Sequence, residues 1–329
     1  MKDMEKRNNI IYLDLRSFGT IGFQDAPNGL WLGKHKIKQK DLLKILADSC
    51  IKNSVDISTI TTEDDLIQSG YPEDRMGFLL KQVLNLPKEY KAEILDQNLL
   101  RVSNERGSVL FVNSETIHAE KNKNWNWKGL KVHVIGANRI TKYYKTPQEV
   151  ARYCRKQKGL LTFLSGINSS NFPLAEEIAK DCQGIIVHDA NNTFDEFYSK
   201  MPLIGRYLSK FSRKNNQDAE ELAERFGKPA IAVSSSHFPS QMGRAGLFSH
   251  RGYLDPDKVK DTSNFLFRLE NIISHNKKER ETFSNHLGYN SKIEVLRFAY
   301  LLTRYGSNPD RFKGAESSYN YPEKVSLSS

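Results

Sequence analysis

The run Val233-Ser234-Ser235-Ser236-His237 directly follows the apolar segment Pro229-Ala230-Ile231-Ala232. An apolar, β-prone segment that ends in small polar residues and a histidine predicts a buried strand with polar side chains at its C-terminal end. In α/β proteins, catalytic and binding groups collect at this end of the strands. Several earlier segments of the chain end in the same way, so the pattern indicates both a fold class and the position of a pocket.

Short apolar runs alternate with amphipathic segments through most of the chain. This alternation predicts parallel β/α construction, as an open sheet or a closed barrel. Strands are expected at Ile10–Leu15, Val55–Ile60, Val109–Val112, Leu130–Ile135, Gly159–Leu164, Gly184–Val187 and Ala230–Val233, with helices that include Gln39–Ile51, Phe172–Cys182 and Asp218–Phe226.

Two regions depart from the alternation. Between Asp64 and Gly107 the chain is irregular and charged, which indicates an insertion or a long connection with helical pieces. After Asp255 the pattern is helical only, at Asp261–Ser274, Asn276–Leu287 and Ser291–Tyr305. We therefore expect a barrel over residues 1–254, a helical C-terminal extension over 255–305 and a loosely ordered tail over 306–329.

Composition narrows the class of protein. Of 329 residues, 38% are hydrophobic and 27% are charged, which is enough apolar matter for a sizeable core. No apolar run is long enough to span a membrane, and Met1–Asn9 lacks the apolar core of a signal peptide, so a cytoplasmic location is expected. Three scattered cysteines without a Cys-x-x-Cys pair argue against a zinc knuckle or a disulfide framework.

The chain is basic, with a formal net charge of +10 and a pI near 9.3. Lysines are dense at Lys34–Lys40, Lys121–Lys131 and Lys277–Arg280. Two interpretations stay open: a solvated basic surface that reflects coding bias, or a phosphate-rich partner, either nucleic acid or a phosphorylated small ligand. Trp125 and Trp127 lie among the lysines, as aromatics do in single-strand binders, or they simply dock a connection on the core.

Six strand-end segments resemble, in their order, the motifs of barrel enzymes of the polymerase and histidinol phosphatase (PHP) family. They are Asp14–Phe18, Ile60–Asp64, Phe111–Glu115, Lys131–Val134, Leu164–Gly166 and Ser234–His237. The resemblance runs from Ile10 to Gly246. It implies a distorted, TIM-like β/α barrel of the PHP type, extended by helices at the C-terminus.

The resemblance also implies a metal site, and this chain departs from it. PHP enzymes bind two or three metal ions through histidines and carboxylates, which activate water and hold phosphate oxygens. Of the family's ligand positions, Glu115, His133 and His237 keep a ligating residue type. The others have changed, with Arg16 and Phe18 for two histidines, Glu63 or Asp64 for a third, Ser165 for a fourth and Ser235 for an aspartate.

Because an arginine cannot be deprotonated to bind a metal, the full cluster cannot assemble. The expected cofactor is either none or one divalent ion, zinc or manganese, on the three retained residues. Each of these also has a structural interpretation: Glu115 as a surface carboxylate, His133 as a core histidine and His237 as a residue that ties down its loop.

Two functions follow from these alternatives. The first is a metal-free binding or scaffold module for nucleic acid or a protein partner, which we favour. The second is a divergent metal-dependent phosphoesterase that uses Glu115, His133 and His237 for the metal. In the enzyme, Asp14, Arg16 and Arg244 would be the catalytic and phosphate-holding residues. Asp14 and Arg16 would otherwise form an ion pair, and Gln241–Gly246 either cradles an anion or is a plain turn.

Overall fold

The structure is a computed structural model. It describes residues 9–15, 41–63, 75–118, 130–137, 149, 152, 160–190, 204–236, 241–275 and 283–287. Among the helices in these ranges, none has both the length and the apolar character needed to cross a bilayer.

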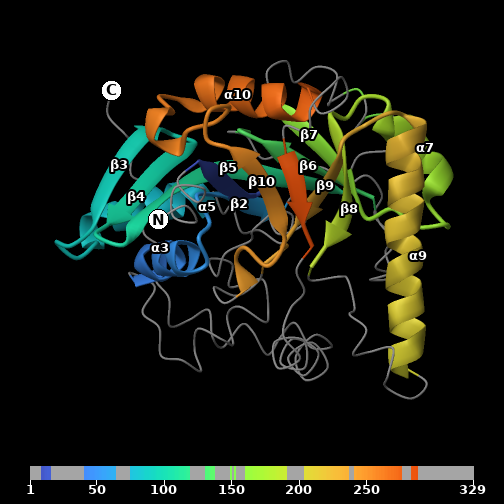
Figure 1. The fold of residues 1–329 in the computed structure, drawn as a ribbon, viewed down its shortest axis with the longest axis horizontal. Coiled ribbons are helices and arrows are strands. Elements are labelled where there is room, and N and C mark those ends of the chain that lie inside the picture. The colour runs from blue at the N-terminus through green and yellow to red at the C-terminus, as the bar shows by residue number, and fades with distance from the viewer. Residues whose placement is uncertain are drawn as a thin grey trace.

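Within the described ranges, eleven strands form one sheet. Nine of them are hydrogen-bonded one to the next and form the wall of a nearly closed barrel (Figure 1). Their order is β11-β10-β1-β2-β5-β6-β7-β8-β9. The bounds are Ile10–Asp14 for β1, Ile57–Glu63 for β2, Gly107–His118 for β5, Lys131–Ile135 for β6, Leu161–Ser165 for β7, Gly184–Asp189 for β8, Ala230–Val233 for β9, Gly246–His250 for β10 and Phe283–His286 for β11.

The predicted α/β barrel is confirmed, but its strands are mixed in direction. The pairs β1·β2, β2·β5, β7·β8 and β8·β9 are parallel. Strand β6 is antiparallel to both β5 and β7, and β10 is antiparallel to both β1 and β11. The expectation of purely parallel construction is therefore wrong at β6 and at β10–β11.

One apolar cluster fills the inside of the barrel. Every barrel strand contributes to it, with residues such as Leu13, Val112, Phe163 and Val233. Helix α10 (Thr262–His275) adds Phe265, Leu266, Leu269, Ile272 and Ile273 to the same cluster. The close approach of Leu266 to Gly136, which follows β6, places α10 at the barrel end where β6 finishes and the antiparallel strand β7 begins. Figure 1 shows α10 lying across this end.

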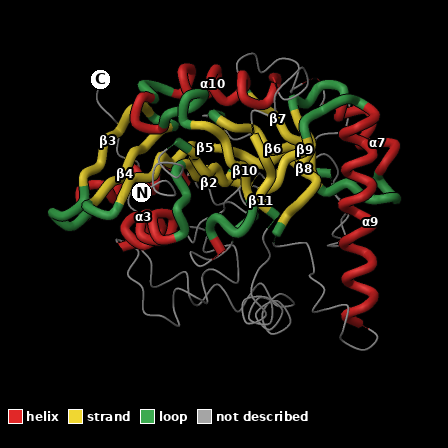
Figure 2. Tube along the Cα trace, viewed as in Figure 1, coloured by secondary structure: helices red, strands yellow, loops and turns green. Residues whose placement is uncertain are grey.

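Helices cover the outer face of the barrel on two sides, as Figure 2 shows. Helices α3 (Leu42–Lys52) and α5 (Arg75–Gln82) pack with Tyr12, Ile60 and Phe111 in one outer cluster, and the short 3-10 turn Val83–Asn85 follows α5. Helices α7 (Phe172–Ala179) and α9 (Ile204–Arg225) cover β6, β7 and β8. Amphipathic helices on an apolar sheet face are what the alternating pattern predicts.

The two ends of the sheet meet through a side chain. The amide of Ala232 on β9 donates to Asn285 Oδ1 on β11 at 2.9 Å, and Asn285 Nδ2 donates to the carbonyl of Ala230, also at 2.9 Å. The primary amide thus imitates one step of a strand ladder across the seam between β11 and β9.

Three local expectations are corrected by the structure. The region 64–107 contains α5 and also a hairpin, β3 (Lys91–Asp96) and β4 (Leu99–Asn104), that extends the sheet from β5. Residues 283–286 form β11 and not part of a helix over 276–287. Strand β8 continues through His188 and Asp189, with an irregularity after Ile186, and so extends beyond its predicted end at Val187.

Candidate functional site

The mouth of the barrel is the end opposite α10, where β1, β2, β5, β7 and β9 finish and β6 begins. Along each strand, alternate residues point inward. Because Ile57, Val112, Ile135 and Phe163 belong to the inner cluster, the register places a polar layer above them on the same face. This mouth layer consists of Thr59, Thr61, Ser114, Thr116, His133 and Ser165, all of which are buried.

His133 is the centre of the mouth layer. Its Nδ1 lies 2.7 Å from Thr116 Oγ1 on β5, and its Nε2 lies 2.7 Å from Ser165 Oγ on β7. A second hydroxyl pair, Thr61 Oγ1 and Ser114 Oγ, joins β2 to β5 at 2.8 Å. The inner polar side chains of four neighbouring strands therefore bond to one another across the mouth.

Glu115 does not join this layer. It pairs in register with Thr62 and Val134, and these positions alternate with the inward-facing Thr61 and His133. Glu115 is 3% exposed and lies on the outer face of the sheet, whereas His133 lies on the inner face. The expectation that Glu115 and His133 converge in one pocket is therefore not met, because a one-residue step along a strand reverses the face.

Asp14 is fully buried at the end of β1 and accepts hydrogen bonds from protein groups. The Ser234 amide donates at 3.3 Å, the Ser234 hydroxyl donates through a short bond, and the Gly243 amide donates at 3.1 Å. The carboxylate thus ties the end of β1 to the serine run after β9 and to the turn before β10. This arrangement suits a structural anchor.

The charge of Asp14 acts on two neighbouring groups. Burial, and secondarily Asp14, raises the pKa of Tyr12 far above its usual value, and the Tyr12 hydroxyl donates to the Gly243 carbonyl at 2.8 Å. Burial and Asp14 also raise the pKa of Cys50, whose Sγ lies 3.9 Å from Met242 Sδ. Both groups stay protonated at neutral pH.

Two positions near Asp14 hold the left-handed backbone conformation. Ser235, 1% exposed, has φ of 48°, which costs free energy for a residue with a Cβ. Gly243 has φ of 72°, and a Cβ there would lie 2.3 Å from Val55 Cγ2, so the turn requires glycine. The motif Gln241–Gly246 is therefore a tightly packed turn, and the backbone amide of its Gly243 donates a hydrogen bond to Asp14.

The remaining predicted site residues divide into two groups. Arg16 and His237, together with Phe18 and Asp64, lie outside the described residues. Arg244 is half-buried within the turn Gln241–Gly246, and Lys131 is half-buried at the start of β6, where it pairs in register with Ser165. Since Lys131 shares the inner face with His133, the mouth layer ends in a cation.

The described residues do not fit the family's metal cluster. No three of their His, Cys, Asp and Glu side chains are arranged to hold a metal ion. A histidine ligates a metal through a free ring nitrogen, yet both nitrogens of His133 are bonded to hydroxyls. Binding a metal at His133 would require displacing Thr116 or Ser165, and Glu115 on the outer face could not join it.

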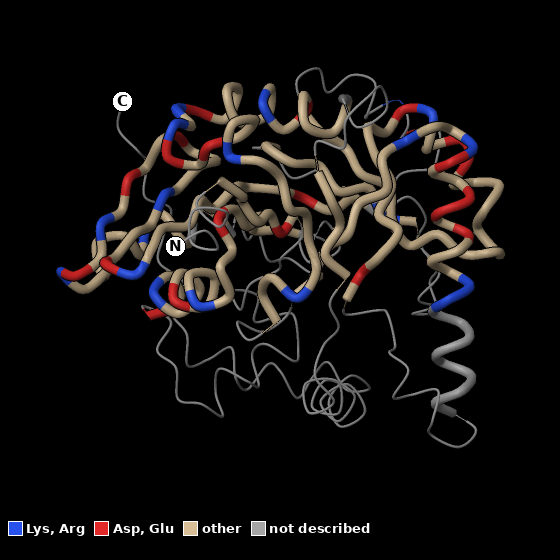
Figure 3. The backbone as a smooth tube through the Cα atoms, in the orientation of Figure 1, with Lys and Arg blue, Asp and Glu red and all other residues tan. Residues whose placement is uncertain are grey.

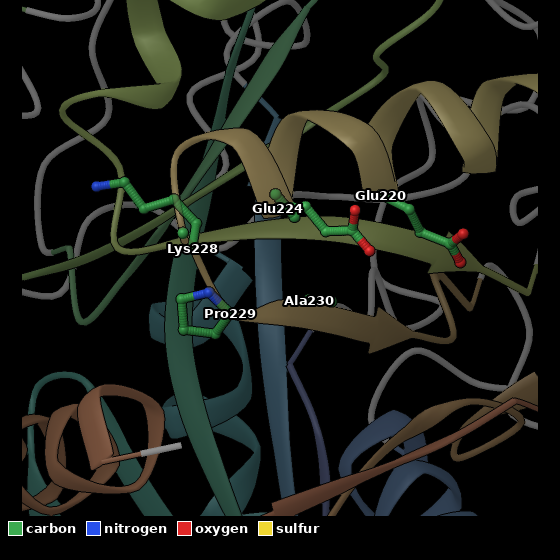
Figure 4. Close-up of a pocket in the computed structure, with 7 residues that line it drawn as sticks. Glu220, Glu224, Lys228, Pro229 and Ala230 are labelled. Carbon is green, nitrogen blue, oxygen red and sulfur yellow. The ribbon is translucent and has the colours of Figure 1, made fainter. Parts of the chain in front are cut away.

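A separate pocket lies at the other end of β9 and is lined by the end of α9, the turn after it and the first residue of β9 (Figure 4). Glu220 and Glu224 line one side, and Lys228 and Pro229 line the other. Lys228 Nζ donates to the carbonyl of Lys180 at 3.0 Å, which ties the turn to the segment after α7. Because β9 begins at Ala230 and reaches the mouth only after Val233, this pocket is not the predicted site.

Charge is spread over the described surface, where Lys and Arg alternate with Asp and Glu on the helices and on the β3–β4 hairpin (Figure 3). Of the lysines in the cluster Lys121–Lys131, the structure describes Lys131 alone. Trp125 and Trp127 lie outside the described residues.

A family model described as PHP-associated (PHP_C) matches residues 213–258. The match runs from the second half of α9 through β9, the Ser234–Ser236 run and β10 to the 3-10 turn Pro256–Lys258. Residues 213–258 of this chain are thus similar to the PHP-associated family model. The predicted PHP resemblance is thereby confirmed in the segment that contains the most informative strand end.

Other comparisons are distant. The solved structure of PsfC from Pseudomonas syringae PB-5123 has a TM-score of 0.49 and 12% identity, over 90% of this chain and 99% of that chain. No curated protein matches the chain.

Sequence reasoning missed the part that Thr61, Ser114 and Thr116 play in this PHP-like barrel. Their signal was present, because small hydroxyl residues recur at the ends of β2 and β5. The pairing of Thr116 and Ser165 with His133 depends on the antiparallel placement of β6 between β5 and β7, which the sequence pattern did not indicate.

Proposed function

We propose that this chain is a metal-free PHP-like barrel that binds nucleic acid at its mouth. The observation that carries the proposal is the contact set of His133, whose two ring nitrogens each lie 2.7 Å from a hydroxyl oxygen. One of these hydroxyls belongs to Ser165, where the PHP scheme has a metal-ligating histidine. Five of the six side chains of the mouth layer therefore bond to one another without an ion, and the sixth, Thr59, keeps a buried hydroxyl without a hydrogen-bond partner among the described residues.

The cationic end of the mouth supports a phosphate-bearing ligand. Lys131 lies on the inner face next to Ser165 in register, and it is half-buried. A half-buried lysine packs its stem on apolar surface and keeps its ammonium group at the water boundary. In sequence, Lys121, Lys123 and Lys128 precede it closely, and the whole chain carries a formal charge of +10.

The test is the salt dependence of binding to a generic single-stranded oligonucleotide. Binding should weaken steeply with salt, because each neutralised phosphate releases counterions. Replacing Lys121, Lys123, Lys128 and Lys131 with glutamine should reduce the slope of log K against log salt by about 0.7 per lost contact.

A control variant has the same change in net charge, but its four substituted lysines lie elsewhere on the surface. Lys81, Lys88, Lys91 and Lys180 are exposed, and their replacement by glutamine should leave the slope nearly unchanged. No binding at about 50 mM salt, or equal slopes for both variants, would contradict the proposal. In that case a protein partner, or coding bias alone, is the better account of the basic chain.

The phosphoesterase alternative requires a metal held by Glu115, His133 and His237. The outer-face position of Glu115 and the bonded nitrogens of His133 weigh against this set. It would be revived by a bound divalent ion that is lost when His237 is changed to glutamine.

A further inference from the structure

We propose that Ser165 is a nucleophile activated by His133, and that the mouth reacts with carboxylic esters that carry a negative charge. The inference is independent of nucleic-acid binding, and it gives the mouth layer a chemistry that needs no metal. It rests on three side chains from three adjacent strands, Thr116 on β5, His133 on β6 and Ser165 on β7.

The geometry is that of a nucleophile, a base and a group that orients the base. Ser165 Oγ lies 2.7 Å from His133 Nε2, within the range for proton transfer from a hydroxyl to an imidazole. Thr116 Oγ1 lies 2.7 Å from His133 Nδ1. With Nδ1–H donating to the Thr116 oxygen, Nε2 carries the lone pair and accepts the proton of Ser165.

Ser165 lies at the mouth end of β7. It is the last residue of β7, and the next residue, Gly166, is exposed and has φ of 74°, so the chain turns away from the strand there. Asn171 Nδ2 donates to the Gly166 carbonyl at 2.9 Å, which holds that turn in place. Ser165 itself is 4% exposed, which favours a small substrate.

Lys131 favours a substrate that carries a negative charge. It is the register partner of Ser165 on the inner face, and directly paired side chains of antiparallel strands have Cβ atoms about 5 Å apart. An ammonium group at that position attracts an anionic ester and stabilises the negative charge that develops on the ester oxygen.

The reaction is balanced without a further reagent. Ser165 Oγ forms a bond to the ester carbon, the carbon–alkoxide bond breaks, and the Ser165 proton passes through His133 Nε2 to the departing alcohol. Water then attacks the acyl carbon and gives a proton to His133, which returns it to Ser165 as the acid leaves. A fluorophosphonate reports the first half: an oxygen–phosphorus bond forms, fluoride leaves and His133 keeps the proton.

The experiment is labelling of the full chain with a small alkyl fluorophosphonate, followed by peptide mass spectrometry. We expect the adduct on Ser165 and its loss in Ser165→Ala. The control is Ser114→Ala, because Ser114 is a buried serine of the same layer that bonds to Thr61 and not to an imidazole. In His133→Gln, labelling should slow by about 100-fold or more.

A second variant keeps the proposal testable if Ser165→Ala or His133→Gln melts early. In Ser165→Cys, the introduced thiol beside His133 should react with iodoacetamide at about pH 6 at least tenfold faster than Cys50 and Cys182, which are buried and serve as internal references. A folded protein without an adduct on Ser165 overturns the proposal, as does an adduct that forms equally fast in His133→Gln. These results leave the salt-dependent binding test unaffected.

Discussion

The amide and the hydroxyl of Ser234 both donate to the carboxylate of Asp14, although 220 positions separate the two residues in the chain. Asp14 closes β1, and Ser234 follows β9, so the contact joins the first and the last strand-end motifs of the PHP-like barrel. Gly243 adds a third donor to the same carboxylate.

Replacing Asp14 with alanine should destabilise the fold. The buried donors of Ser234 and Gly243 would lose their acceptor, and a buried donor left unsatisfied costs roughly 1–3 kcal/mol, so we expect a loss of about 3 kcal/mol in the free energy of unfolding. Urea denaturation measures it. Asp218→Ala is the control, because Asp218 accepts only a surface hydrogen bond from Ser169. Equal stability of the two variants would contradict the role of Asp14 as an anchor.

Removing the Asn285 side chain should loosen the seam of the barrel. In Asn285→Ala the hydrogen bonds to Ala230 and Ala232 are lost, and two such bonds contribute about 2 kcal/mol. Native-state hydrogen exchange should show faster exchange at the Ala232 amide. Ser284→Ala, a change on the same strand at an exposed position, should leave that amide protected. If both variants exchange alike, the seam is held by other contacts.

Asp56 should make the free energy of unfolding depend on pH. Burial raises the pKa of Asp56 above its usual 3.8, while the Tyr12 amide and Arg251 counteract this effect and Asp257 and Asp255 add to it. A carboxyl whose pKa is raised in the folded state contributes to the free energy of unfolding. This contribution is fully present below the pKa of the unfolded state and is lost as the pH rises through the pKa of the folded state.

Asp56→Asn should not lose stability as the pH rises, because the amide oxygen of the asparagine still accepts the hydrogen bond from the Tyr12 backbone amide and carries no charge. The stability of the variant relative to the wild type should therefore increase from about pH 4 to about pH 7. Asp218→Asn on the surface is the comparison. Denaturation at a series of pH values measures the difference, and a constant difference for Asp56→Asn would refute the expectation.

Adding manganese or zinc should leave the melting temperature nearly unchanged. A ligand at a hundred times its dissociation constant stabilises the folded state by about 2.7 kcal/mol, so a true site would be evident in thermal denaturation. A metal-dependent rise that disappears in His237→Gln but persists in His188→Gln would favour the phosphoesterase alternative.

Much of the fold could be predicted because buried strands and amphipathic helices leave clear patterns. Strand β9 matches its predicted bounds, and β1, β6, α3 and α10 differ from theirs by a few residues at most. The short strand β11 has the sequence Phe-Ser-Asn-His, with a single apolar residue, so no alternation marked it. The hairpin β3–β4 was missed because β3 is half-exposed and charged, and its pairing with β4 depends on the turn at Gln97–Asn98.

The site could be predicted only in part. Asp14, Ser165 and the Ser234–Ser236 run were expected at strand ends and lie there, whereas His133 lies in the middle of β6. The side of the sheet to which Glu115 points could not be read from the sequence, because Leu110, Phe111 and Val112 are all apolar and both faces of β5 are buried. Only the register with β2 and β6 assigns one face to Glu115 and the other to Ser114 and Thr116.

Helix α10 closes one end of the barrel, because its apolar residues pack into the inner cluster. These residues are Phe265, Leu266, Leu269, Ile272 and Ile273. Because α10 and the inner apolar cluster fill the barrel below the mouth layer, we expect a molecule that reaches His133 to approach from the mouth, where Lys131 and the strand ends lie. The two proposed ligands, an oligonucleotide and a small ester, would then reach the barrel at the same end. An oligonucleotide bound across the mouth would slow the entry of a small ester, even if the two ligands contact no common atom of the protein.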